Sequence, residues 1–185
     1  MCHEEKIQLS HTEKNRLKAQ KIKDEAIYIR HEGKEGGYIE FPISSGQNKC
    51  EARDNYNAYL LLANRGYKYK LLPVVNLPNV QNPDAKNLVT NHYSDAKHPT
   101  TANGKSAVKN SIRSAYSEGV KEIVIRFCLN YNHRDLQRGL YESFSNKRYK
   151  KIEVVIFIHL NNEVEIINIL DLMRELKNTK GKPNK

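Results

Sequence analysis

The sequence contains few cysteines, and their arrangement excludes two common uses of this residue. Cys2, Cys50 and Cys128 are an odd set and show no CxxC spacing. Neither a disulfide framework nor a thiolate zinc site is therefore indicated, and a reducing cytosol is the simplest environment. Cys128 ends the apolar run EIVIRFC, where we expect a small, buried hydrophobic residue rather than a nucleophile.

Long hydrophobic runs are also absent. The first 26 residues contain no apolar segment of signal-peptide length, and no later stretch approaches the length of a membrane span. We therefore expect a cytoplasmic protein without a membrane partner. The sequence also lacks a P-loop, a GxSxG elbow, a zinc-finger spacing and an RNA-binding aromatic consensus, which removes several classes of enzyme and binding domain.

Charge is the strongest feature of the composition. The chain has 185 residues, of which 38% are hydrophobic, enough to bury one ordinary core. Its 31 Lys and Arg against 21 Asp and Glu give a formal net charge of +10. A positive surface attracts polyanions over long range and gains from counterion release, so nucleic acid is the leading class of partner.

Hydrophobic periodicity and turn residues predict helices alternating with strands. The order predicts an α/β (α+β) fold with a mixed central sheet flanked by helices. We expect residues 1–46 to form an N-terminal helix and β-hairpin extension, 47–172 the main domain, and 173–185 a basic disordered tail. Helices are expected over 10–26, 50–66, 103–119 and 133–148, and strands over 26–32, 37–43, 67–75, two short ones within 82–99, 121–129, 152–160 and 163–170.

The stretch NPDAKNLVTNHYSDAKHP, residues 82–99, holds the residue types that phosphodiester cleavage requires. Carboxylates can hold a divalent cation, and a lysine can orient a water or neutralise developing charge. In a strand, Asp95 and Lys97 point to the same face, and the ten residues between Asp84 and Asp95 allow one strand, a turn and a return. NPD is also a strong turn signal by itself, and Asp95 with Lys97 would also make an ordinary exposed charge pair.

These residues resemble the PD-(D/E)xK nuclease superfamily, whose pattern is matched by Pro83-Asp84 and by Asp95-Ala96-Lys97. The frame around them, LLLANRGY, KYKLLP, NPDA, KSAVKNSIRSAYSEG and EIVIRF, is similar to the C-terminal nuclease domains of bacterial polymorphic toxins. These include contact-dependent inhibition toxins that cleave transfer RNA. The resemblance covers roughly residues 47–170, which is a typical domain length.

The resemblance implies a restriction-endonuclease-like core and assigns roles to individual residues. Asp84 and Asp95 would bind Mg²⁺ or another divalent cation, and Lys97 would position the attacking water or stabilise developing charge. A further acid on the preceding helix would be Glu51, our choice as the third metal ligand, or Asp54. The substrate would be RNA, with transfer RNA favoured, or DNA, and an immunity protein is a possible partner.

Other readings of the same residues remain open. His92 and His98 flank the motif, so a metal-independent ribonuclease could use histidine and Lys97 as general acid and base. Another alternative is a basic nucleic-acid-binding protein of a mobile element, without catalysis. In each case the residues expected to contact nucleic acid are Lys105, Lys109, Arg113 and His98.

Overall fold

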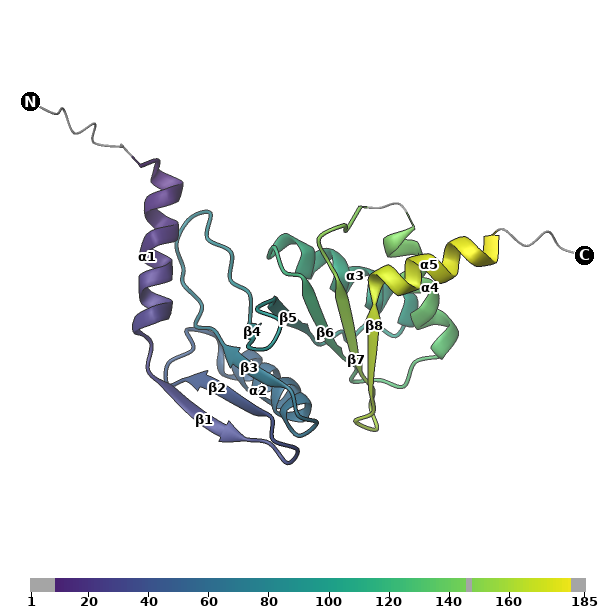
Figure 1. The fold of residues 1–185 in the computed structure, drawn as a ribbon, viewed down its shortest axis with the longest axis horizontal. Helices are drawn as coiled ribbons and strands as arrows, with labels where there is room; N and C mark the ends of the chain where they lie inside the picture. The colour runs from purple at the N-terminus through teal and green to yellow at the C-terminus, as the bar shows by residue number, and fades with distance from the viewer. Residues whose placement is uncertain (1–8, 146–147, 181–185) are drawn as a thin grey trace, which may run out of the picture.

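The computed structural model describes residues 9–145 and 148–180, with side chains described up to residue 175. The described chain forms one mixed eight-stranded sheet with helices packed against it (Figure 1), which confirms the predicted fold class. The helices are α1 (His11–Glu25), α2 (Lys49–Ala63), α3 (Gly104–Ser117), α4 (His133–Phe144) and α5 (Ile169–Lys180). The strands are β1 (Tyr28–Glu32), β2 (Tyr38–Pro42), β3 (Lys68–Leu71), β4 (Ala85–Asn87), β5 (Tyr93–Lys97), β6 (Glu122–Arg126), β7 (Val154–Ile158) and β8 (Val164–Asn168).

The strands lie in the sheet in the same order as in the sequence, from β1 to β8. Three pairs are parallel, β2 with β3, β5 with β6, and β6 with β7, and each is connected through a helix. The remaining neighbours are antiparallel. Because β5, β6 and β7 run in the same direction, their carboxyl ends meet at one edge of the sheet, where ligands commonly bind in α/β proteins.

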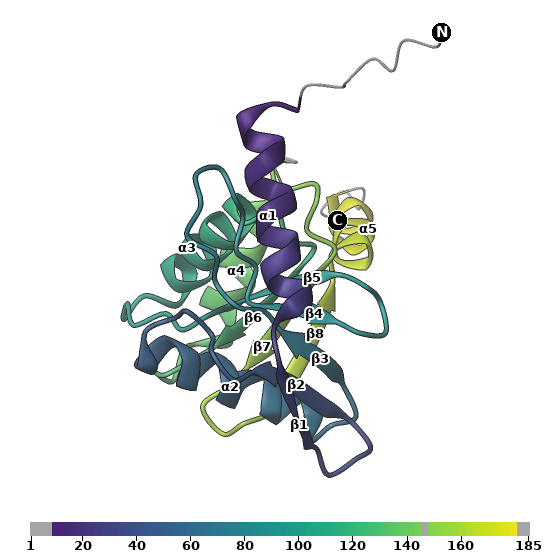
Figure 2. The same ribbon diagram turned by 90° about the vertical axis from the view of Figure 1, so that its left-hand side faces the viewer.

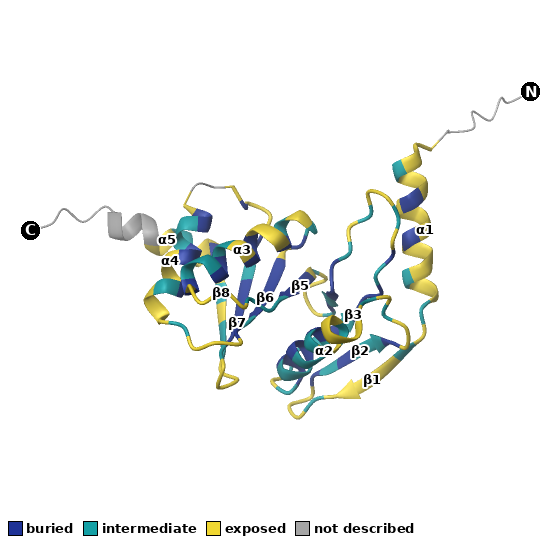
Figure 3. Cartoon of the chain, turned by 180° about the vertical axis from the view of Figure 1, so that it is seen from behind, coloured by how far each residue is buried: buried dark blue, intermediate teal, exposed yellow. Residues whose placement is uncertain are grey.

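Two hydrophobic cores lie on opposite faces of this sheet. Helices α3 and α4 cover one face, with Ile123 and Ile125 of β6 in that core, and α2 covers the other, with Val124 of β6 in the second core. Since successive residues of a strand point to opposite faces, β6 contributes to both cores and is almost wholly buried (Figure 3). This burial explains the continuous apolar run that marked β6 in the sequence.

Helix α1 begins as its sequence predicts. Ser10 and Glu13 form a capping box, in which the Ser10 side chain accepts from the Glu13 N–H and the Glu13 carboxylate accepts from the Ser10 N–H. Most of α1 is exposed, and it packs beside the segment between β3 and β4 (Figures 1 and 2). Asn15 Nδ2 donates to Pro78 O at 3.2 Å, which ties the helix to that segment.

The structure differs from four local predictions. The β1–β2 hairpin is part of the main sheet, because β2 pairs with β3. Residues 173–180, predicted as a disordered tail, belong to α5, and 181–185 lie outside the described residues. The last strand ends at Asn168, whose Oδ1 accepts from the Leu170 N–H and starts α5. Cys128 is exposed, because β6 ends two residues earlier.

None of the described helices has the length and apolar character needed to cross a membrane.

Candidate active site

Asp84 is held in place by the end of a short strand pair. Ala85 pairs with Ser94, and the antiparallel ladder goes no further in that direction, which leaves the next amide of β5 without a strand partner. The Asp84 carboxylate fills this position, since its Oδ2 accepts from the Ala96 N–H at 2.8 Å. Its other oxygen, Oδ1, accepts from Gln47 Nε2 at 2.9 Å. Asp84 is therefore fixed in orientation by both of its oxygens.

Asp95 and Lys97 lie on the same face of β5, as their spacing predicts. Lys97 Nζ lies 2.6 Å from Asp95 Oδ2 as an ion pair. The Asp95 side chain is 3% exposed and the Lys97 side chain 25% exposed, so the carboxylate lies beneath the ammonium group. Exposed ion pairs contribute little to stability, but this one is mostly buried and links the lysine to the acidic residues.

The two aspartates are close enough to affect each other's ionisation. Burial raises the pKa of Asp84 to about 8, and the negative charge of Asp95 adds to this effect, against the opposing Ala96 N–H and Lys97. Burial also raises the pKa of Asp95, while Lys97 opposes the rise. Lys97 is desolvated too, but the two carboxylates outweigh that and its pKa is raised. If both acids were ionised they would carry more negative charge than Lys97 can neutralise, so Asp84 holds its proton up to about pH 8 in the absence of a further cation.

This arrangement fits a divalent cation. Mg²⁺ is commonly held by one or two carboxylates together with water and substrate phosphate, and a cation would favour the ionised form of both acids. The predicted third ligand, Glu51, is not part of the arrangement. It is exposed in the first turn of α2, where its carboxylate accepts from Asn48 Nδ2 at 3.1 Å. Within residues 9–145 and 148–180, no group of three or more His, Cys, Asp or Glu side chains could hold a metal.

Two polar residues of the site did not appear among the predicted functional residues. Gln47 lies in the loop before α2 and reaches Asp84 across 37 positions of sequence, and nothing in its local pattern marks it. Asn55 is buried on α2, one helical turn after Glu51. Its Oδ1 lies 3.2 Å from His98 Nε2, and its Nδ2 is buried without a hydrogen-bond partner. The only available signal was that Asn55 lies on the helix where the resemblance places a further acid, next to Asp54.

The two histidines that flank the motif lie in different surroundings. His98 is bonded to Asn55, and burial lowers the pKa of its imidazole. His92 Nε2 lies 3.4 Å from Glu153, which also pairs with Lys121. His98 therefore lines the same cavity as Lys97, whereas His92 pairs with Glu153.

The residues predicted to contact nucleic acid lie next to the acidic site, but only some of them are free of an acidic partner in the described chain. Lys97 and His98 line a cavity of about 310 Å³ together with Asn110 of α3. Asn110 also lines a neighbouring cavity of about 210 Å³ that contains Lys109, Arg113 and Arg148. Basic residues thus continue from Lys97 along α3.

Glu142 of α4 neutralises part of this basic surface. Its carboxylate lies 2.6 Å from Lys105 Nζ and 2.9 Å from Lys109 Nζ. Hydrogen bonds from these two lysines lower the pKa of Glu142 to about 2, so it remains charged. Arg113 donates to Asn110 Oδ1 at 3.3 Å and has no ion pair in the described structure. Arg113 is therefore better placed to bind a phosphate than Lys105 or Lys109.

No family model matches the chain, and no curated protein matches it. Among solved structures, the chain is similar to the CdiA-CT/CdiI toxin and immunity complex from Burkholderia pseudomallei. The sequence identity is 19% and the TM-score 0.49, with 69% of this chain and 91% of that chain covered. A similarity at this level assigns no activity, so the function is inferred from the site itself.

Proposed function

We propose that the protein is a divalent-cation-dependent endonuclease of the PD-(D/E)xK type that cleaves nucleic acid. The observation that carries the proposal is the close grouping of Asp84, Asp95 and Lys97 around β5, with two buried acids whose pKa values are both raised. Perturbed acids of this kind are common in catalytic sites, and the net charge of +10 suits a polyanionic substrate.

Each of the three residues has a distinct chemical task. Asp84 and Asp95 would hold Mg²⁺, and the bound cation would polarise the scissile phosphate and make a water molecule more acidic. Lys97 has its ammonium group partly exposed above Asp95, where it can orient a water and offset negative charge on the phosphate. Gln47 keeps the Asp84 carboxylate in one orientation, since it donates to Oδ1 while the Ala96 N–H binds Oδ2.

The substrate strand would follow the basic residues that begin at Lys97. The two cavities that share Asn110 connect Lys97 to Arg113 and Arg148, so phosphates on one side of the scissile bond would lie along α3. We favour RNA, and transfer RNA in particular, with a toxin-like role and an immunity protein as partner. This preference rests on the resemblance of the sequence to toxin nuclease domains.

The proposal is tested by cleavage assays on the full chain. Purified protein is incubated with a transfer-RNA pool and, separately, with plasmid DNA, in Mg²⁺ or in chelator. Wild type should cleave only in Mg²⁺, and D84N and K97M should each reduce the rate by at least about 100-fold, as expected when a group acting in the transition state is removed. D84N keeps a side-chain oxygen as acceptor for the Ala96 N–H and removes a carboxylate ligand, and Gln47 can turn its amide so that its oxygen accepts from the amide nitrogen that the substitution introduces.

Two variants on α1 serve as matched controls. D24N and K18M make the same chemical changes on exposed positions of this helix and should leave the rate unchanged. Full cleavage in chelator would contradict the metal-dependent mechanism and favour the metal-independent one, in which a histidine and Lys97 act as general acid and base. Salt-sensitive binding without cleavage would identify a non-catalytic nucleic-acid-binding protein.

A further inference from the structure

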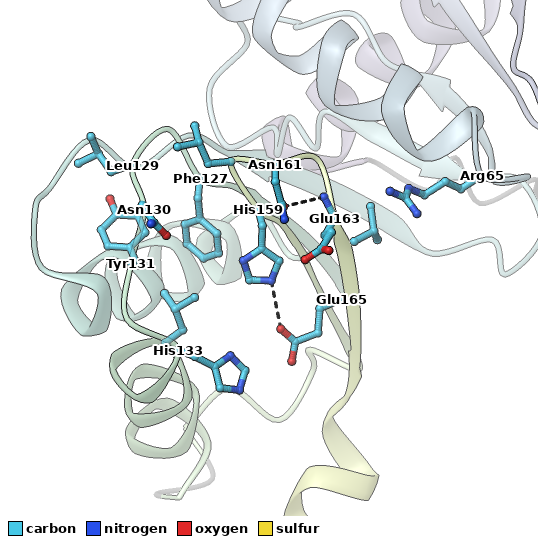
Figure 4. Close-up of a pocket in the computed structure, with 13 residues that line it drawn as sticks. Arg65, Phe127, Leu129, Asn130, Tyr131, His133, His159, Asn161, Glu163 and Glu165 are labelled. Atoms are coloured by element: carbon cyan, nitrogen blue, oxygen red, sulfur yellow. Dashed lines mark hydrogen bonds and ion pairs between the residues drawn. The ribbon is translucent and has the colours of Figure 1, made fainter.

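A large cavity lies at the carboxyl ends of β6 and β7, apart from the acidic site. Its volume is about 770 Å³, within the range of small-molecule binding sites. Residues that directly follow the two strands line it, among them Phe127 after β6 and His159 after β7. Figure 4 shows their rings side by side, with His133 and Glu165 facing the same space.

The apolar part of the cavity is a fixed group of aromatic rings. The centroid of Phe127 lies 5.2 Å from that of Tyr131 and 5.8 Å from that of His159. Phe127 is 3% exposed and anchored in the core between the sheet and α4. Phe127 has no free face itself, so the partly exposed rings of Tyr131 and His159, which it holds in place, are the ones that can stack on a planar ligand without losing much conformational entropy.

The polar groups around these rings are suited to a nucleobase. The carboxylate of Glu163 and the imidazole of His133 have no hydrogen bond or ion pair within the described part of the chain, and both line the cavity. Glu165 also lines it, and its Oε2 lies 3.2 Å from His159 Nε2. Carboxylates repel phosphate but accept hydrogen bonds from the amino groups of bases. The cavity therefore favours a planar, apolar-faced ligand that carries N–H donors.

The cavity lies close to the proposed active site. Tyr131 OH donates to Thr101 O at 2.6 Å, and Thr101 lines the cavity that contains Lys97. In the sheet, Lys97 pairs with Ile125 of β6, which pairs with Phe157 of β7. The spacing between neighbouring strands therefore puts β7 only about 10 Å from the strand that carries Lys97. A nucleotide next to the scissile phosphate can span this distance.

We propose that this cavity, lined by Phe127, Tyr131, His133, His159, Glu163 and Glu165, binds one unstacked nucleobase of the substrate strand. The inference rests on the proposed nuclease function and extends it to substrate selection. Because two carboxylates face the ligand, bases with an exocyclic amino group, adenine, guanine and cytosine, bind better than uracil. Unstacking a base costs a few kcal/mol, which contacts with the aromatic rings offset.

The test measures binding without catalysis. The full-length protein, in chelator, is titrated with AMP, GMP, CMP and UMP up to millimolar concentration, and the imidazole resonances of His133 and His159 are followed by NMR. We expect at least one of the three amino-bearing nucleotides to shift both resonances, with UMP weakest. E163Q should weaken binding about fivefold, since one charge-assisted hydrogen bond is lost, and H133A should also weaken it.

The controls are E25Q and H11A, which make the same changes at exposed positions of α1. His11 and His133 are both first residues of a helix, so the two substitutions are closely matched. No shift by any nucleotide, or equal affinity in E163Q and wild type, would overturn the inference. UMP binding as tight as the others would overturn the selection by amino groups. Nucleotide binding without Mg²⁺-dependent cleavage would refute only the nuclease proposal, and cleavage without nucleotide binding only the base pocket.

Discussion

Buried acids occur on both faces of the sheet, and their surroundings give them different roles. Asp84 and Asp95 lie beside the partly exposed ammonium group of Lys97, whereas Glu122 lies at the start of β6 and belongs to the face covered by α2. The Glu122 carboxylate accepts from Tyr69 OH at 2.8 Å and from Asn87 Nδ2 at 3.0 Å. Burial raises the pKa of Glu122, and these neutral donors only partly oppose it. We interpret Glu122 as a structural residue that joins β3, β4 and β6.

This pKa shift predicts a dependence of stability on pH. A carboxyl group whose pKa is raised on folding holds its proton in the folded chain at pH values where the unfolded chain has lost it. The stability it contributes is therefore complete below the pKa of the unfolded chain and declines as pH rises through the folded pKa. E122Q cannot ionise, so its free energy of unfolding should fall less steeply with rising pH than that of wild type.

Urea denaturation at a series of pH values from acid to neutral measures both slopes. His92, whose positive charge would lower the pKa of Glu122, is present in both proteins. E25Q, on exposed α1, should retain the wild-type slope. Identical slopes for wild type and E122Q would show that Glu122 ionises normally in the folded chain.

At the scale of elements, the close approach of α3 and α4 depends on one glycine. A β-carbon at Gly139 would lie 2.8 Å from Lys105 O and 2.8 Å from the β-carbon of Val108. Both are parts of α3 that cannot rotate away, because one is backbone and the other is attached directly to it. The crossing positions Lys105 and Lys109 over Glu142, and so determines which cations of α3 remain unpaired.

We therefore expect G139A to destabilise the protein although alanine favours helix. Overpacking costs about 1–3 kcal/mol, while the gain in helix propensity is about 1 kcal/mol, so the free energy of unfolding should fall by up to about 2 kcal/mol. Chemical denaturation measures this loss. Q137A, on the exposed face of the same helix, should change stability by less than about 0.5 kcal/mol. A stabilised G139A would mean that the two helices cross less closely.

At the scale of the whole molecule, the edge formed by the ends of β5, β6 and β7 brings the proposed functional parts together. Lys97 ends β5, and the aromatic cavity begins just after β6 and β7. Asp95 belongs to β5, Asp84 is bonded to it, and the basic residues lie along α3, so a nucleic-acid strand that crosses this edge would meet all of them. The parallel arrangement of these three strands is the reason that residues so distant in sequence share one surface.

This arrangement predicts which cations control the dependence of binding on salt. In chelator, R113A should reduce the slope of log affinity against log salt concentration by about 0.7–0.9, the value for one phosphate contact. K109A should reduce it by less, because Glu142 already pairs with Lys109 at 2.9 Å. Fluorescence anisotropy with labelled RNA measures both, and K18A on α1 is the control. Equal effects of R113A and K18A would place the nucleic acid elsewhere.

Local features of the chain could be predicted from sequence because each depends on neighbouring residues. The capping box of Ser10 and Glu13, the buried strand β6 and the shared face of Asp95 and Lys97 all follow from short-range periodicity or spacing. The local hydrophobic pattern gave a wrong prediction where a strand and a helix follow each other directly within one apolar run. The apolar run at residues 163–170 predicted one strand. In the structure the strand ends at Asn168, whose side chain caps the helix that begins at Ile169.

The sequence by itself determined the order of helices and strands as far as β8, the excess of positive charge and the presence of an acid–acid–lysine set. Tertiary structure alone decided that Gln47 and Ala96 orient Asp84, and that Glu51 stays at the surface. It also decided that Glu142 neutralises two lysines of α3 while Arg113 remains without an ion pair. The physical reason is that burial and long-range pairing set a side chain's ionisation and partners, and both depend on elements far apart in the chain.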